Sequence, residues 1–133
     1  MSVQLNHTIV WCSNPSKSAR FLAEILDRPA PSRFSHFDVV QLDNGVSLDF
    51  AEQAGSIQQQ HYAFLISEED FDAVLDRIQR NGVRHWADPA RRHEGAINRN
   101  DGGRGIYFAD PDDHTLEVIT RPYGGVAGTA RIS

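Results

Sequence analysis

Residues 105–118 read Gly-Ile-Tyr-Phe-Ala-Asp-Pro-Asp-Asp-His-Thr-Leu-Glu-Val. Residues 106–109 predict a strand, the Asp- and Pro-containing residues 110–113 predict a turn, and residues 115–120 predict a second strand. In that second strand Glu117 stands between Leu116 and Val118, so its side chain points to the opposite face. Burying a carboxylate without a partner in so small a domain costs several kcal/mol, so an inward-facing Glu117 needs a binding partner.

The same strand–turn–strand pattern occurs earlier in the chain. Residues 37–42 and 46–51 predict two strands, and Asp43-Asn44-Gly45 predicts the hairpin turn between them. Asp49 stands between Leu48 and Phe50 in the way that Glu117 stands between its neighbours. The chain therefore carries two copies of a hairpin with one carboxylate on the face opposite its apolar residues.

A helix is predicted before each hairpin. The first follows the N-cap residue Asn14 and ends by Pro29, and the second follows the cap residue Ser67 and ends at Gly82. Apolar residues recur at helical spacing in both helices: Phe21, Leu22, Ile25 and Leu26 in the first, and Phe71, Val74, Leu75 and Ile78 in the second.

A β-rich segment precedes each helix, and a histidine opens each segment. His7 lies in the predicted strand 5–11, and His61 directly precedes the predicted strand 62–66. Residues 83–86 predict a further short strand. The order of elements is an internal repeat of βαβββ type, which predicts an α+β fold. Two such repeats can pair their curved sheets into an open barrel whose concave side holds a site.

Length and charge limit the classes of function. We expect one domain over residues 1–133, with module one at about 4–52, a linker at 53–60, module two at about 61–121 and a tail at 122–133. The net charge of −5 argues against nucleic acid as a partner. Without an apolar run of membrane length or a signal-peptide pattern, we expect no membrane partner and a cytoplasmic location. Cys12 is the only cysteine and is expected to be a small buried hydrophobe.

These features resemble the vicinal-oxygen-chelate (VOC) superfamily, which contains glyoxalase I, extradiol dioxygenases, fosfomycin-resistance transferases and bleomycin-resistance proteins. The resemblance runs from residues 5–7 to 116–118 and is most specific at 61–64 and 105–114. The second stretch resembles the family's aromatic–Asp-Pro-Asp-Gly-His turn, with Asp113 where glycine is usual. The resemblance implies the open-barrel fold of two βαβββ modules.

The resemblance also implies a divalent metal ion, such as Fe²⁺, Mn²⁺, Ni²⁺ or Zn²⁺, held by His7, His61 and Glu117. Two imidazoles and one carboxylate hold such ions and leave coordination positions open for a substrate. Asp49 occupies a fourth family position, where glutamate is commoner among glyoxalase-like members. Because aspartate is one methylene shorter, Asp49 is a possible ligand, either directly or through a water.

Further site candidates lie near the second hairpin. We expect catalytic roles for Glu117, Asp49 and Tyr107, the last matching a substrate-contacting tyrosine of the fosfomycin transferases. The polar insertion 87–104 is interpreted as a lid with substrate-binding residues, or alternatively as a solvated surface loop. Candidates for substrate binding are Tyr107, Arg99, Arg104 and His93. The lysine and potassium-binding loop of those transferases have no counterpart here, which argues against membership of that group.

Two classes of function follow. The leading hypothesis is a metal-dependent enzyme that chelates a small oxygen-rich or aromatic substrate through two oxygens. Three protein ligands would favour an Fe²⁺ dioxygenase or a related transferase, and four would favour a glyoxalase, isomerase or lyase. The alternative is a metal-free drug-sequestering protein of bleomycin-resistance type, although those proteins lack the His/His/Glu set. The resemblance also implies a homodimer, with Trp11 and Trp86 as interface candidates.

Overall fold

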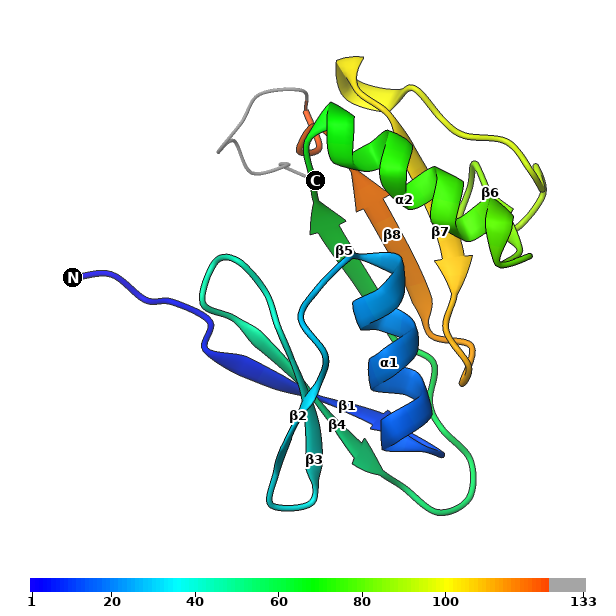
Figure 1. Cartoon of the computed structure of the whole chain (residues 1–133). Helices are drawn as coiled ribbons and strands as arrows, with labels where there is room; N and C mark the ends of the chain where they lie inside the picture. The colour runs from blue at the N-terminus through cyan, green and yellow to red at the C-terminus, as the bar shows by residue number, and fades with distance from the viewer. Residues whose placement is uncertain (125–133) are drawn as a thin grey trace. The chain divides into compact units, whose positions relative to one another are not determined.

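A computed structural model of the chain describes residues 1–124 (Figure 1). The chain divides into two compact units. Unit 1 contains residues 1–59 and 110–112, and unit 2 contains residues 60–109 and those from 113 onward. Each unit contains one four-stranded sheet and one α-helix of more than ten residues.

Unit 1 has the strand order β1-β4-β3-β2. Strand β1 pairs with β4 in parallel, and the other neighbours are antiparallel. The helix packs against β3 and β4 (Figure 1). The elements are β1 (His7–Cys12), α1 (Pro15–Ile25), β2 (Ser32–Phe34), β3 (Phe37–Gln41) and β4 (Ser47–Glu52).

Unit 2 repeats this topology with the order β5-β8-β7-β6. Strand β5 pairs with β8 in parallel, and the hairpin β7–β8 and the edge strand β6 are antiparallel to their neighbours. The elements are β5 (His61–Leu65), α2 (Glu68–Arg80), β6 (His85–Trp86), the 3₁₀ turn η1 (Asn100–Gly102), β7 (Gly105–Ala109) and β8 (Thr115–Ile119).

The register of the two sheets shows that the repeat extends to single residues. His7 pairs with the residue two positions before Asp49, and His61 pairs with the residue two positions before Glu117. Since strand side chains alternate between faces, each histidine shares a sheet face with the carboxylate of its own unit. Each unit therefore presents one imidazole and one carboxylate on the same face.

Local signals place both helices as predicted. The Asn14 side chain accepts a hydrogen bond from the Lys17 backbone N–H at 3.1 Å, and the Ser67 hydroxyl accepts one from the Asp70 N–H at 3.0 Å. These contacts are the N-caps that the sequence predicts. At the other end of α2, Gly82 adopts a φ of +64°, the left-handed conformation that ends many helices.

One strand was not expected from the sequence, and one backbone angle explains a residue preference of the resembled family. Strand β2 is a three-residue exposed strand that the sequence pattern did not indicate, because Ser-Arg-Phe shows neither alternation nor a β-branched residue. In the β7–β8 turn Asp113 has a φ of +68°. This left-handed conformation strains an aspartate less than most residues, and it explains why the resembled family prefers glycine there.

Cys12 is buried as predicted. Its thiol donates a hydrogen bond to the Ala51 carbonyl at 3.4 Å. Burial, with smaller contributions from the negative charges of Asp112 and Asp110, raises the pKa of the thiol from 9.0 to about 11. The side chain is therefore a neutral core group at physiological pH.

No helix within residues 1–124 has the length and apolar character needed to cross a membrane.

Candidate metal centre

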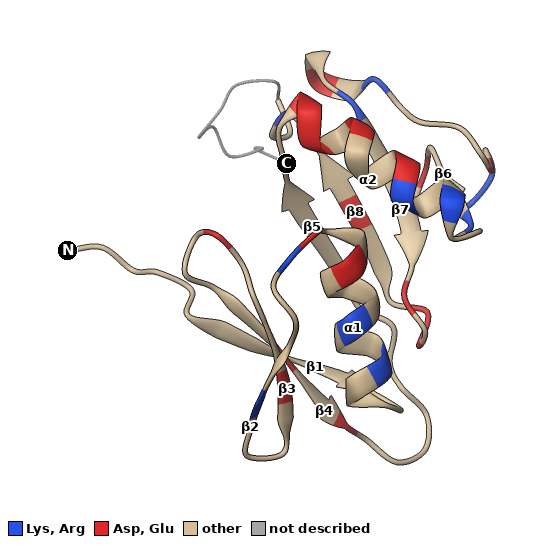
Figure 2. Cartoon of the chain, in the orientation of Figure 1, with Lys and Arg blue, Asp and Glu red and all other residues tan. Residues whose placement is uncertain are grey.

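The candidate metal centre is built around the carboxylate of Glu117 in unit 2. This carboxylate lies in the middle of β8, at the acidic position of that strand in Figure 2, and its residue is 1% exposed. The Nε2 atom of His61 lies 3.0 Å from Glu117 Oε1. Nε2 is the ring nitrogen that faces this carboxylate, so a hydrogen on Nε2 would be donated to Glu117 Oε1.

Two tyrosines also reach this carboxylate. The Tyr123 hydroxyl donates to Glu117 Oε1 at 2.8 Å. Tyr107 pairs directly opposite Glu117 in the β7–β8 ladder and hydrogen-bonds to it. Burial, together with this carboxylate, raises the pKa of Tyr107 well above its usual range. The Tyr107 phenol therefore stays protonated and acts as a donor. We call His61, Tyr107, Glu117 and Tyr123 the carboxylate cluster.

The equivalent positions of unit 1 are less enclosed. Asp49 is half-buried, and its Oδ1 atom accepts a hydrogen bond from the Ser47 hydroxyl at 2.9 Å. His7 is exposed, with Nδ1 2.7 Å from Asn6 Oδ1. Opposite Asp49 the ladder places Val39, where unit 2 has Tyr107. Only the carboxylate of unit 2 faces a phenol across its sheet.

The predicted metal ligands thus divide between the units. Unit 2 brings His61 and Glu117 together, whereas His7 belongs to unit 1. Over residues 1–124, no three His, Cys, Asp or Glu side chains gather closely enough to hold an ion. The donor types nevertheless fit a divalent metal, because an imidazole nitrogen and a buried carboxylate oxygen converge. The three-ligand set remains a prediction.

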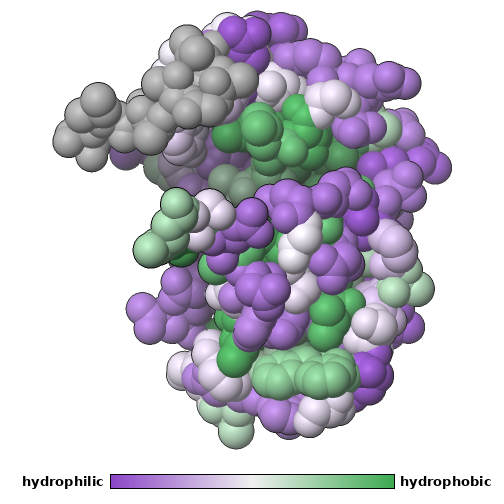
Figure 3. Space-filling model, turned by 90° about the vertical axis from the view of Figure 1, so that its left-hand side faces the viewer, coloured by the Kyte–Doolittle hydropathy of each residue, from purple (hydrophilic) through white to green (hydrophobic). Residues whose placement is uncertain are grey.

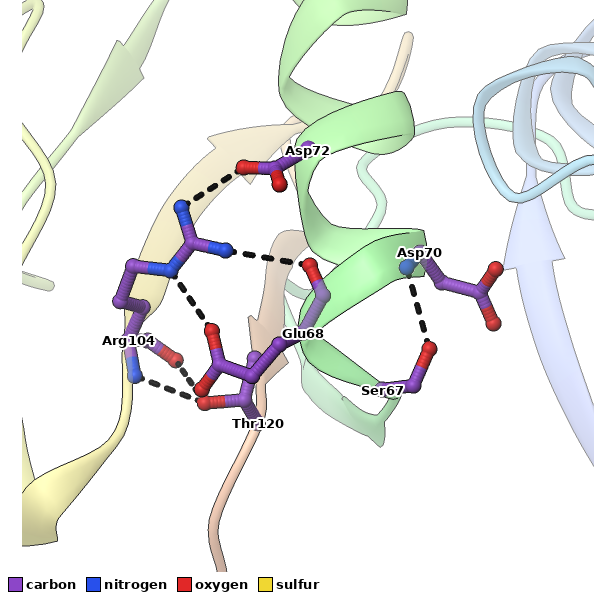
Figure 4. A network of polar contacts seen from close by, with 6 residues as sticks. All are labelled: Ser67, Glu68, Asp70, Asp72, Arg104 and Thr120. Atoms are coloured by element: carbon purple, nitrogen blue, oxygen red, sulfur yellow. Dashed lines mark hydrogen bonds and ion pairs between the residues drawn. The ribbon is translucent and has the colours of Figure 1, made fainter.

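Arg104, expected to bind substrate, has a structural contact set instead (Figure 4). Its guanidinium donates to the Glu68 carboxylate at 2.7 Å, the Asp72 carboxylate at 2.8 Å and the Glu68 carbonyl at 3.1 Å. It also lies over the Phe71 ring, 4.4 Å from its centroid. These contacts use three of the five N–H donors of the guanidinium and join the start of β7 to the first turns of α2. We therefore leave Arg104 out of the proposed site.

The insertion 87–104 is anchored to its own unit. The Ala87 N–H donates to the His93 carbonyl, the Gly95 N–H donates to the His85 carbonyl, and Asn98 and Gly105 exchange two backbone hydrogen bonds. This pattern describes a folded surface loop and supports the alternative to the lid interpretation. His93 and Arg99 are exposed on this loop, and neither belongs to the carboxylate cluster.

Trp86 does not have the exposed position expected of an interface residue. It is 3% exposed, and the guanidinium groups of Arg84 and Arg91 lie 5.2 and 4.8 Å from its ring centroid. Trp11, in contrast, is 46% exposed.

Sequence reasoning missed Tyr123 because it falls in the segment assigned to a loose tail. The signal available was a tyrosine six positions after Glu117, directly after Pro122 and ahead of a run of small residues. The rest of that tail, residues 125–133, lies outside the described residues.

Comparison with known proteins decides the family. The model of the Glyoxalase/Bleomycin resistance protein/Dioxygenase superfamily matches residues 4–118. The chain belongs to this superfamily. The predicted family and the predicted α+β fold of two modules are thereby confirmed.

Relatives within the superfamily include named enzymes. The chain is 32% identical to "Glutathione transferase FosA" of Serratia marcescens over an alignment 148 positions long, with 98% of each protein covered. It is 56% identical to the solved structure "Oxidase ChaP-H1", with a TM-score of 0.91 over 93% of this chain and 100% of that one. "Oxidase ChaP-H2" is 54% identical, with a TM-score of 0.92 over 95% and 100%.

These relatives favour the enzyme class over the drug-sequestering alternative. FosA is named as a transferase, and "Metallothiol transferase FosB" of Bacillus licheniformis, 29% identical, is named for a metal as well. The match to FosA covers 98% of each protein, so the chain is related to the transferase group. The absence of the lysine of that group had argued against membership. The identity to the two oxidases is nevertheless much higher.

Proposed function

We propose that this protein is a divalent-metal-dependent oxidase that acts on a small aromatic or oxygen-rich substrate, with His7, His61 and Glu117 as metal ligands. The observation that carries the proposal is the buried Glu117 carboxylate, faced by His61 and held by two phenols. The identity of more than half to two oxidases supports the reaction type.

A divalent ion at this position would supply Lewis acidity and, if it is iron, redox chemistry with dioxygen. The protein's own contribution is to orient the carboxylate. Tyr107 and Tyr123 donate hydrogen bonds to it from two different parts of the chain. The phenol oxygen of Tyr107 also lies beside the site, where it can accept a hydrogen bond from a substrate hydroxyl.

We propose three protein ligands, with Asp49 outside the set. Support comes from the contrast between the two units: Glu117 is buried and bonded to two tyrosines, whereas Asp49 is half-buried, faces Val39 and is bonded to a serine. As a carboxylate that does not bind the metal, Asp49 is a candidate general base for the substrate. The matching register of Asp49 and Glu117 favours the second candidate, a four-ligand enzyme of glyoxalase type.

Loading the protein with Fe²⁺ and adding nitric oxide, a stand-in for dioxygen, separates the two candidates. We expect a high-spin iron–nitrosyl EPR signal in the wild type and in Asp49→Ala, and none in Glu117→Ala. Metal loss in Asp49→Ala as complete as that in Glu117→Ala would instead establish four ligands. A wild type that gives no signal after loading would contradict the oxidase proposal.

We also propose a homodimer. Apolar side chains share the sheet faces of the two histidines and are open to solvent: Ile9 at 37%, Trp11 at 46% and Leu65 at 60% exposure. The face drawn in Figure 3 carries several separate hydrophobic patches among polar residues. A second copy covering such residues would remove apolar area from water. Sedimentation at micromolar concentration tests this, since a species of single-chain mass would contradict it.

A further inference from the structure

Tyr123 belongs to a segment that the structure ties firmly to unit 2. Just before it, Thr120 exchanges hydrogen bonds with Arg104: the Arg104 N–H donates to the Thr120 hydroxyl at 2.8 Å, and the Thr120 N–H donates to the Arg104 carbonyl at 3.0 Å. The side chain of Arg121 packs so closely on Gly103 that a Cβ built there would lie 2.5 Å from Arg121 Cγ. These contacts fix the direction in which the chain leaves β8.

The course of the chain after β8 places the Tyr123 hydroxyl beside the Glu117 carboxylate. The hydroxyl lies 2.8 Å from Oε1, the same oxygen that faces His61 Nε2 at 3.0 Å. Tyr107 donates to the same carboxylate from β7. The Glu117 carboxylate cannot rotate about its side-chain bond without breaking both contacts of Oε1.

A carboxylate needs such support before it can bind a metal well. Groups that hydrogen-bond to a metal ligand orient it and tune its basicity, and their removal typically lowers metal affinity about 10–100-fold. Tyr107 is held within the β7 strand, so its hydroxyl reaches Glu117 from across the ladder. Tyr123 approaches from the segment after β8, and the two phenols together restrict the carboxylate from two elements.

We infer that Tyr123 is a positioning residue for the metal site: its hydroxyl holds Glu117 in the orientation in which that carboxylate and His61 bind one ion. This role rests on the proposed function, because it assigns Tyr123 to the same site. Tyr123 acts through Glu117 and does not itself bind the ion. The segment of residues 120–123 thereby contributes to the site.

Tyr123→Phe removes only the hydroxyl oxygen, and Tyr62→Phe is its matched control. Tyr62 is adjacent to His61 in β5, but its side chain lies on the opposite face, where its ring meets that of His114 edge-on at 5.9 Å. The probe is Co²⁺, whose visible absorption reports the geometry of its ligands. We would measure Co²⁺ affinity by chelator competition, together with the melting temperature of each metal-free variant.

We expect Tyr123→Phe to melt close to the wild type, to bind Co²⁺ about 10–100-fold more weakly and to shift its absorption bands. Tyr62→Phe should match the wild type in Co²⁺ affinity and in absorption spectrum. Wild-type affinity and spectrum in Tyr123→Phe, with binding lost in Glu117→Ala, would overturn the positioning role alone. The same change in Tyr62→Phe would also overturn it. A wild type that binds no Co²⁺, or a Glu117→Ala variant that binds it normally, would overturn the proposed function and this role together.

Discussion

Glu117 and Asp49 show how similar residues at repeated positions acquire different chemistry. Both stand between apolar neighbours in the last strand of a hairpin, so the sequence predicts the same inward direction for both. What separates them is the residue across the ladder, Tyr107 for Glu117 and Val39 for Asp49. That pairing depends on register between distant segments, which a local pattern does not specify. The sequence therefore predicted the two carboxylates but not their difference in burial and bonding.

At the same scale, Cys12 gives a prediction about pH. Burial raises the pKa of the thiol from its ordinary value of 9.0 to about 11, so the folded state keeps this proton to higher pH than an exposed thiol would. The stability that this contributes is complete below pH 9 and is lost as pH rises toward 11. Two pKa units correspond to roughly 2–3 kcal/mol.

We therefore expect the free energy of unfolding of the wild type to fall more steeply from pH 9 to 11 than that of Cys12→Ala. Urea titrations of both proteins at several pH values measure the difference, because other alkaline groups contribute equally to each. Parallel curves for the two proteins would show that the thiol is not buried in the folded state.

Helices and hairpins were predictable because their signals are local. The cap at Ser67, the apolar stripe of α2 and the glycine stop at Gly82 lie within a single element, and the structure has all three. Strand β2 and the ion pairs of Arg104 were not predictable, because they depend on neighbours brought close by the fold. Tyr123 was missed for the same reason, since its partner lies on another element.

The close packing of Gly103 on the segment after β8 gives a prediction at the scale of elements. A Cβ at position 103 would lie 2.5 Å from both Arg121 Cγ and Thr120 Oγ1. Gly103→Ala must therefore push that segment away from the start of β7. We expect a loss of about 1–3 kcal/mol in the free energy of unfolding.

Urea unfolding of Gly103→Ala beside Ser56→Ala, an exposed linker position, measures this loss. Stability equal to that of the control variant would mean that the two segments are not held together as described. A loss of stability in this range would show that Gly103, before β7, packs tightly against residues 120–121, after β8.

At the scale of the whole molecule, the repeat gives each unit one imidazole and one carboxylate at equivalent positions. Unit 1 carries His7 and Asp49, and unit 2 carries His61 and Glu117 on the equivalent face. Over the described residues no three such groups lie close enough together to hold an ion. The proposed ligand set takes His7 from unit 1 and His61 and Glu117 from unit 2, so its support is the repeat in the sequence together with the contact between His61 and Glu117.

Metal content per chain is the measurement that tests this account most directly. The wild type, His7→Ala, His61→Ala and Glu117→Ala would be loaded with Fe²⁺ or Mn²⁺, dialysed against a weak chelator and analysed for metal, with the exposed His36→Ala as control. We predict near-stoichiometric metal in the wild type and in the control, and loss in each of the other three. Metal retained in His7→Ala would contradict a centre that needs both repeats, and none in the wild type would contradict the metal centre itself.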